Sequence, residues 1–422
     1  MAMTDFTIIS RSMTARMFST VTTIITVAVA VGLMLLLLSL RKAGEEAFSR
    51  GAGNMHLLVS RDSSAMVSVL NGVFYANAPQ RPIDWAKYEQ MTSTYPIDWA
   101  IPTQLGDSYR GHPVMATTRE FFSKFQPDPS IPWALRDGRY FDKAFEVVLG
   151  SGVARRTGLR LGEKIVLTHG ILEEGHEHPE FQYEVVGILE PTGTSHDRAL
   201  FTDLESTWII HAHDRRLSAA PNAGRTTSAD LTPADQLITG IYLALPTREG
   251  SQVPAVLQQV FDMMRRDTSI TVAQPGAETR KLFEIIKDMN LLFIGMAGVV
   301  MVSSGIAIML ALYNSMEQRK RQIAVLRVLG CSRARISSLV LTESALIGLL
   351  GAIAGIVVWM IGSQAAAAVL KDVLGLVVTP KLDAATTLVI VLATIALASL
   401  AGIVPSIVAY RTSVARNLKP IG

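Results

Sequence analysis

The histidines and glutamates of one short segment, 169–181, could bind a metal ion. Six of the eight histidines lie between residues 169 and 213, and His169, His176 and His178 share this segment with four glutamates. Imidazole nitrogens and carboxylate oxygens are common zinc ligands, and the spacing of His176 and His178 permits both to bind one ion. No cysteine stands beside them, and the fixed spacing of a structural zinc site is absent. Two interpretations stay open: a zinc site, and a solvated acidic loop whose histidines bind nothing.

A second candidate site is the basic segment 314–335, which lies between two long apolar runs. Its six basic residues are Arg319, Lys320, Arg321, Arg327, Arg333 and Arg335. On a helical wheel the apolar arc consists of Ile323, Val325, Leu326, Val328 and Leu329. The opposite side carries Lys320, Ala324 and Arg327, and Gly330 is expected to end the helix. Such a short helix either lies along a membrane surface as an anchor or docks in a groove on a cytoplasmic partner.

The chain shows no residue pattern of an enzyme. No nucleophile and base are suitably spaced, no pair of carboxylates marks a pocket, and no Gly-x-x-x-x-Gly-Lys-Ser/Thr run is present for an ATPase of that type. A net charge of +3 is too small to indicate nucleic-acid binding. The one cysteine, Cys331, excludes a disulfide framework.

Composition and charge placement predict a membrane protein that carries a soluble domain. Of the 422 residues 49% are hydrophobic and 18% charged. Four runs of roughly 20 residues or more predict membrane spans; these are 19–40, 291–313, 339–370 and 386–410. The basic residues around 314–338 predict a cytoplasmic segment there. The termini, 1–18 and 411–422, are then also cytoplasmic, and 41–280 and the loop 371–385 are outside.

The large segment 41–280 is expected to form an α+β domain. Strands are predicted within 55–60, 164–169, 183–189, 236–245 and 269–274, and a helix within 253–266. Gly158 is expected to end a short helix, and Gly162 to occupy a tight turn. Residues 281–290 form an amphipathic helix that continues into the second span, with Leu282, Ile285, Ile286 and Met289 on its apolar face. This helix either packs on its own domain or acts as a rigid stalk.

Three motifs resemble the MacB/FtsX-type permeases of ABC transporters. Residues 316–336, MEQRKRQIAVLRVLGCSRARI, are followed by Glu343 and Gly348 as in that family. Gln322 departs from the glutamate frequent there. The run 150–189 resembles the family's periplasmic core domain, and 402–411 resembles the motif at the C-terminal end of the family's sequences. The resemblance implies that 317–330 is the coupling helix that contacts an ATPase. The residues it assigns to this contact are Glu317, Arg319, Arg321, Ile323, Val325, Leu326, Arg327, Leu329 and Gly330.

The resemblance also implies a function. The chain would be a non-catalytic permease in the bacterial cytoplasmic (inner) membrane, paired as a homodimer with a separate ATPase subunit that binds ATP and Mg²⁺. It would export or extract a hydrophobic or lipid-linked substrate. Its further partners would be a periplasmic adaptor or substrate-binding protein and membrane lipid, and it would bind no nucleic acid. The alternative is an FtsX-like transducer that moves no cargo and regulates an extracytoplasmic partner such as a cell-wall hydrolase.

Overall fold

The computed structural model describes residues 5–79, 81–128, 131–169, 176–220, 224–248, 250–251, 253–328, 330–374 and 378–411. The chain divides into two compact units. The membrane unit consists of Met1–Ala43, Ile286–Ala368 and Thr379–Gly422. The second, here called the core domain, consists of Gly44–Ile285 and Val369–Val378.

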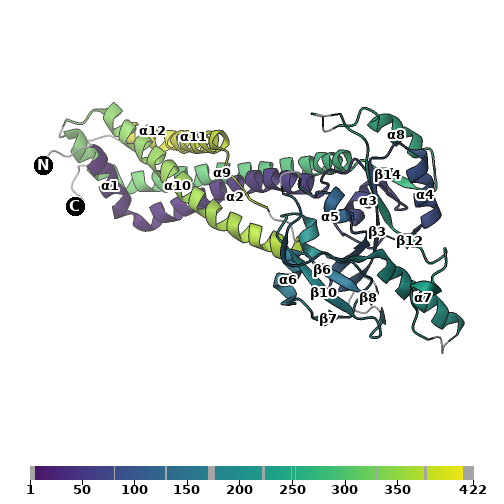
Figure 1. The fold of residues 1–422 in the computed structure, drawn as a ribbon. Coiled ribbons are helices and arrows are strands. Elements are labelled where there is room, and N and C mark those ends of the chain that lie inside the picture. Colours follow the sequence, from purple (N-terminus) through teal and green to yellow (C-terminus); the bar gives the residue numbers. More distant parts are fainter. Residues whose placement is uncertain are drawn as a thin grey trace. The chain divides into compact units, whose positions relative to one another are not determined.

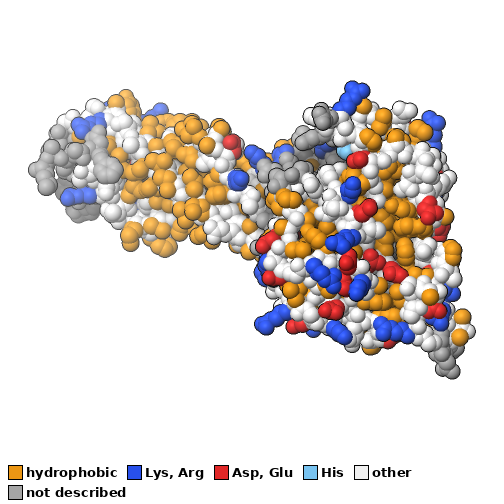
Figure 2. Space-filling model, in the orientation of Figure 1, with side chains coloured by type: hydrophobic (Ala, Val, Ile, Leu, Met, Phe, Trp, Pro, Cys, Tyr) orange, Lys and Arg blue, Asp and Glu red, His pale blue; other side chains and the backbone are white. Residues whose placement is uncertain are grey.

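The membrane unit is helical. Its helices are α1 Asp5–Ala15, α2 Met17–Gly51, α9 Pro275–Val328, α10 Arg333–Leu374, α11 Ala384–Ala401 and α12 Ile403–Arg411, of which α2, α9 and α10 continue into the core domain. The stretches long and apolar enough to cross a membrane are Met17–Gly44, Leu291–Asn314, Arg333–Leu370 and Ala384–Arg411. Figure 2 shows hydrophobic side chains covering much of the visible surface of these helices. The predicted fold class, four membrane helices with a mixed α/β domain between the first and second, is confirmed.

Several helices extend beyond the predicted spans, and the limits of the spans themselves stay a prediction. Helix α2 continues to Gly51, past the predicted end of the first span at 40. Helix α9 begins at Pro275 and not at 281, since proline suits the first position of a helix. Helix α10 begins at Arg333 and not at 339, because the Ser332 hydroxyl accepts a hydrogen bond from the Arg335 amide. At its other end α10 enters the predicted loop 371–385.

Close contacts at glycines join the membrane helices. A Cβ added at Gly351 would lie 2.6 Å from the Val27 Cβ, and one at Gly355 would lie 2.7 Å from the Val31 Cβ, so α10 packs directly on α2. Small residues at this spacing allow such an approach. Helix α9 lies beside α2 (Figure 1), where Ser304 Oγ on α9 is 3.4 Å from a backbone oxygen of α2.

The core domain contains a mixed β-sheet with strand order β14-β1-β13-β3-β4-β11-β6-β10-β5. Strand bounds are β1 Leu57–Ser60, β2 Ile83–Asp84, β3 Trp99–Tyr109, β4 His112–Thr117, β5 Leu135–Gly138, β6 Glu146–Leu149, β7 Lys164–Ile165, β8 Thr168–His169, β9 His176–Glu177, β10 Tyr183–Leu189, β11 Leu200–Asp203, β12 Leu237–Ile238, β13 Gly240–Ala244 and β14 Thr271–Ala273. The helices are α3 Ala65–Gly72, α4 Trp85–Thr94, α5 Phe121–Lys124, α6 Ser151–Thr157, α7 Leu204–Ala219 and α8 Leu257–Met264 (Figure 1), with 3-10 turns η1 Ser195–Arg198 and η2 Ser228–Asp230.

Local sequence signals in the core domain are mostly confirmed. Each predicted strand run contains at least one strand, and β10 has the predicted bounds. Gly158 ends α6 with φ of +73°, and Gly162 has φ of +80° in the following turn. The predicted helix 253–266 is shorter, because only Leu257–Met264 is helical. Strands β3 and β4, central to the sheet, have no counterpart in the prediction.

Candidate functional site

The predicted coupling segment is the last part of α9 and not a separate short helix. The helix continues unbroken from the second span to Val328, and Gly330, with φ of +95°, follows directly. A left-handed residue at this position is a common helix stop, and glycine adopts it without a Cβ clash. The side chains of Glu317, Arg319, Arg321 and Leu326, and the whole of Leu329, lie outside the described residues.

The apolar arc of this segment is divided between two environments. Ile323 is buried and packs with Met316 of α9, Ile336 and Val340 of α10 and Ala409 of α12. Val325 and Val328, by contrast, are 43% and 64% exposed. The segment continues α9, so packing on α10 and α12 sets its rotational phase.

The polar side of the predicted wheel needs a correction. Ala324, which the wheel places on the polar side, is fully buried, whereas Arg327 is half-buried. Ile323 thus packs within the membrane unit, whereas Val325 and Val328 are exposed, and contact of this segment with an ATPase stays a prediction.

The predicted stalk face lies mostly outside the described side chains. Leu282 is half-buried, and the side chains of Ile285, Ile286 and Met289 are not described. Nearby, Lys281 Nζ lies 2.7 Å from Glu278 Oε1, a pair one turn apart on α9. The backbone is helical throughout this stretch, which a rigid stalk requires.

The histidine segment contacts α7 through alternating imidazole and carboxylate groups. His178 lies 3.3 Å from Glu180 Oε1 through Nδ1 and 3.3 Å from Asp214 Oδ1 through Nε2. His213 Nε2 lies 3.2 Å from the same Glu180 oxygen. Burial disfavours the ionised form of Glu180, but its backbone hydrogen bond and the two histidines outweigh this effect and lower its pKa.

The described residues contain no group of three His, Cys, Asp or Glu side chains arranged to hold a metal ion. The side chains of His169 and His176 lie outside the described part of the chain. Their backbones are placed directly opposite one another in the β8–β9 pair. The zinc hypothesis for His169, His176 and His178 thus stays a prediction.

A buried histidine of the core domain, His196, lies in a shell of aromatic rings. Its ring centroid is 5.4 Å from that of Phe125, 5.6 Å from that of Tyr75 and 5.9 Å from that of Trp133. Phe121 and Phe201 complete the shell. The sequence does not predict this cluster, because the aromatic residues around His196 come from distant segments.

Both ring nitrogens of His196 have partners. Nδ1 lies 2.5 Å from the Tyr75 hydroxyl, and Nε2 lies 3.3 Å from the carbonyl oxygen of Gly51, the last residue of α2. Since a carbonyl only accepts, Nε2 carries the proton and the Tyr75 hydroxyl donates to Nδ1. Burial lowers the pKa of His196 to about 4, although the Gly51 carbonyl acts in the opposite direction. His196 is therefore neutral at pH 7 and binds the end of α2 to the aromatic core.

The residues beside His196 hold the same segment to the loop after α3. Ser195 Oγ donates to the Val73 carbonyl over 2.6 Å, and Arg198 Nη2 donates to the Tyr75 carbonyl over 2.9 Å. A Cβ at Gly150 would lie 2.6 Å from the Asp197 carbonyl oxygen, so only glycine allows this approach. The η1 turn is thus attached to several elements of the core domain.

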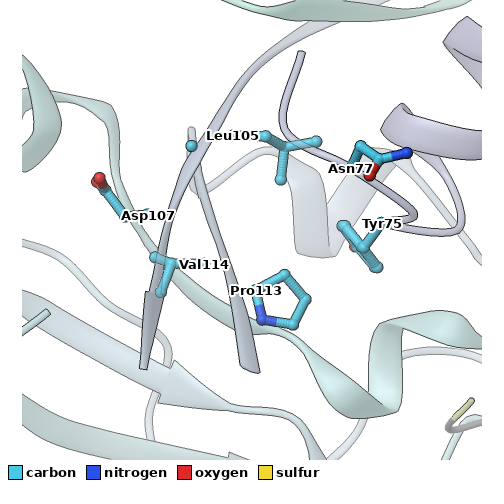
Figure 3. A pocket seen from close by; sticks show the side chains of 7 residues that line it. Tyr75, Asn77, Leu105, Asp107, Pro113 and Val114 are labelled. Atoms are coloured by element: carbon cyan, nitrogen blue, oxygen red, sulfur yellow. The ribbon is translucent and has the colours of Figure 1, made fainter. Parts of the chain in front are cut away.

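A small hollow lies between the β3–β4 hairpin and the loop after α3 (Figure 3). It is lined by Tyr75, Asn77, Leu105, Gly106, Asp107, Pro113 and Val114. Its space is that of about one water molecule, whereas ligand pockets measure roughly 300–1,000 Å³. The hollow is therefore too small for a substrate of lipid size.

Four helices long and apolar enough to cross a membrane, with a large α/β domain after the first, define the class of protein. Residues 294–414 match the family "FtsX-like permease C-terminal", and residues 19–261 match the "MacB-like periplasmic core domain". The chain belongs to this MacB/FtsX family of ABC transporter permeases. Members are permease components, generally without catalytic activity, and the family implies an ATPase partner.

Two curated relatives and one solved structure resemble parts of the chain. The lipoprotein-releasing system transmembrane protein LolC of Neisseria meningitidis serogroup B is 24% identical over 50% of this chain and 46% of its own length. An uncharacterized ABC transporter permease of Methanocaldococcus jannaschii is 22% identical over 28% of this chain and 30% of its own. The chain therefore spans less than half the length of either relative. The extracellular domain of the noncanonic ABC-type transporter YknZ from Gram-positive bacteria aligns with 46% of this chain and 96% of its own, with a TM-score of 0.26 and 7% identity.

Proposed function

We propose that this chain is the permease subunit of an ABC transporter that exports or extracts a hydrophobic or lipid-linked substrate from a bacterial cytoplasmic membrane. The observation that carries the proposal is the continuity of α9. One helix of 54 residues contains the start of the stalk at Pro275, the second span and the coupling segment up to Val328. A partner that moves the coupling segment therefore moves a helix whose other end belongs to the core domain.

The ATPase is a separate subunit in this proposal, and it binds ATP and Mg²⁺. The exposed Val325 and Val328 are the described apolar residues available for its groove. Both termini and residues 314–338 face the cytoplasm, because basic residues gather there. Two copies of the permease form the complex, since two-fold assemblies are the commonest. A periplasmic adaptor or substrate-binding protein completes it.

The choice of a lipid-linked substrate is supported by the likeness to LolC, whose name describes a lipoprotein-releasing system. The alternative is an FtsX-like transducer that uses the same helix to regulate a cell-wall hydrolase without moving cargo. The continuous α9 supports both, and the likeness to LolC favours the first.

The test is purification of the full chain from native membranes in mild detergent, with mass spectrometry of bound proteins and lipids. Recovery of an ATPase with an adaptor or a lipid-linked cargo is the expected result. Recovery of an ATPase with a wall hydrolase would support the transducer. A complex without any ATPase would contradict both functions.

Zinc binding is proposed separately for the segment of His169, His176 and His178. The β8–β9 register supports it, because this register places residues 169 and 176 opposite one another. His178 follows two positions after residue 176. Zinc titration of the purified chain is expected to show a site that is weakened in a His176→Ala/His178→Ala variant. Equal affinity of the two proteins would leave only the solvated acidic loop.

A further inference from the structure

A largely buried ion pair joins the junction of α1 and α2 to α10, the helix of the third span. Arg16 Nη2 lies 2.6 Å from Glu343 Oε1, and Ser12 Oγ donates to the same oxygen over 2.7 Å. Arg16 Nη2 also donates to Ser12 Oγ over 3.2 Å. Glu343 is only 3% exposed, and Ser12 is buried as well. These three residues are called the Glu343 cluster.

The cluster lies on the inward stripe of α1. Ile9, Ser12, Met13 and Arg16 recur at the spacing of one helix face, and Ile9 and Ser12 are buried. Arg11 and Thr14, on the other face, are exposed. Arg16 is the single residue between α1 and α2, so its guanidinium holds the point where the two helices join.

On α10 the same cluster lies next to the contacts of the coupling segment. Val340, three residues before Glu343, packs with Met316 and Ile323 of α9. The first turns of α10 thus contact the end of α9 through apolar side chains and α1 through the Glu343 cluster. Charges buried among membrane helices are costly and usually have a function. An ion pair of this kind can keep α1 attached to α10 when the helices move.

We propose that the Glu343 cluster is a positioning device that makes α1, α2 and α10 move together when an ATPase acts on the coupling segment. Arg16, Ser12 and Glu343 touch neither nucleotide nor substrate; they act by keeping α1 on α10. This proposal rests on the proposed function, because it needs a partner that drives the coupling segment.

The first experiment measures ATP hydrolysis by the full complex in liposomes, relative to the ATPase alone and normalised to assembled complex. Glu343→Gln and Arg16→Gln are each expected to reduce the permease-dependent part about tenfold, within the usual range of coupling between sites. The charge-swapped Arg16→Glu/Glu343→Arg variant is expected to recover most of it. Arg11→Gln, which removes an exposed arginine of α1, is the matched control and should match the wild type.

The outcomes separate the two proposals. A wild-type permease that does not change the hydrolysis rate would contradict the proposed function. A responsive wild type with unchanged Glu343→Gln and Arg16→Gln variants would overturn the positioning role alone. A swapped variant no better than the single variants, although assembled, would also overturn the role of the ion pair.

A second experiment tests the tether without ATPase. In a Cys331→Ser background, Ile9→Cys is expected to react slowly with a maleimide, because Ile9 lies on the buried face of α1. Adding Glu343→Gln should release α1 and raise this rate several-fold, whereas Ser10→Cys on the exposed face should react rapidly in both backgrounds. Equal protection of position 9 with and without Glu343 would show that the ion pair does not hold α1.

Discussion

The Tyr75 hydroxyl lies 2.5 Å from Nδ1 of His196, although 121 positions separate the two residues in the chain. The other nitrogen of His196 faces the Gly51 carbonyl at the end of α2. One neutral imidazole therefore connects the loop after α3 with the helix that contains the first span. All three residues belong to the core domain, so this relationship holds together parts of that domain.

Removing the partner of His196 is expected to destabilise the core domain. Tyr75→Phe leaves the buried Nδ1 without a donor, which costs about 1–3 kcal/mol of unfolding free energy. The measurement is urea denaturation followed by tryptophan fluorescence, since four of the five tryptophans lie in the core domain. Tyr95→Phe is the control, because its hydroxyl makes no hydrogen bond among the described residues. A Tyr75→Phe variant as stable as this control would contradict the hydrogen bond.

Mild acid is also expected to destabilise the core domain. Burial lowers the pKa of His196 to about 4, and burial with Arg156 lowers that of His112 to about 4, from 6.5 in the unfolded chain. The unfolded chain then binds more protons between these values, so stability is complete above pH 6.5 and falls towards pH 4. For the fully buried His196 the loss amounts to about 3 kcal/mol. Denaturation at several pH values should show that the unfolding free energy of His196→Gln depends less steeply on pH. An unchanged pH dependence would show that His196 does not cause the effect.

The glycines of α10 are expected to tolerate no side chain where they face α2. Gly351→Ala places a Cβ 2.6 Å from that of Val27, so α2 and α10 must separate. We expect a lower melting temperature in detergent and a smaller yield of folded protein. Gly295→Ala on α9 is the control, because a Cβ there meets nothing within 4 Å of the described atoms. Equal melting temperatures for the two variants would show that α2 and α10 do not pack through Gly351.

The two environments of the coupling segment predict two kinds of defect. Val325→Asp/Val328→Asp changes exposed side chains and should abolish the response of the partner ATPase while the permease remains folded. Ile323→Asp places a charge in the contact with Ile336 and Val340 and should reduce the amount of folded permease. Size-exclusion chromatography and ATPase assays distinguish them. A normal ATPase response of the valine variant would exclude docking through these two residues.

The continuity of α9 predicts that coupling depends on helical phase. Deleting two residues within 285–289 rotates the preceding part of the helix by roughly 200° and should abolish transport. Deleting four residues changes the phase by only roughly 40° and should retain part of the activity, although it shortens the helix more. Transport or ATPase stimulation in liposomes is the readout. Equal activity of both deletions would argue against a rigid lever.

Local patterns predicted much of this architecture. The four apolar runs, the strand β10 and the glycine stops at Gly158 and Gly330 follow from residues within one turn or one strand of each other. The phase of 323–328 could not be predicted in this way. A helical wheel treats the segment as a free helix, whereas packing of Ile323 on α10 and α12 decides which side is buried.

The sequence alone determined the membrane class, the place of the α/β domain after the first span and the motif 316–336 that carries the family resemblance. Each depends on hydrophobicity, charge or spacing over short stretches of chain. Only the tertiary structure decided that Glu343 pairs with Arg16, 327 residues away, and that His196 joins Tyr75 to Gly51. Such pairs leave no periodic signal in the sequence. They form because folding brings buried polar groups together, where each needs a partner in place of water.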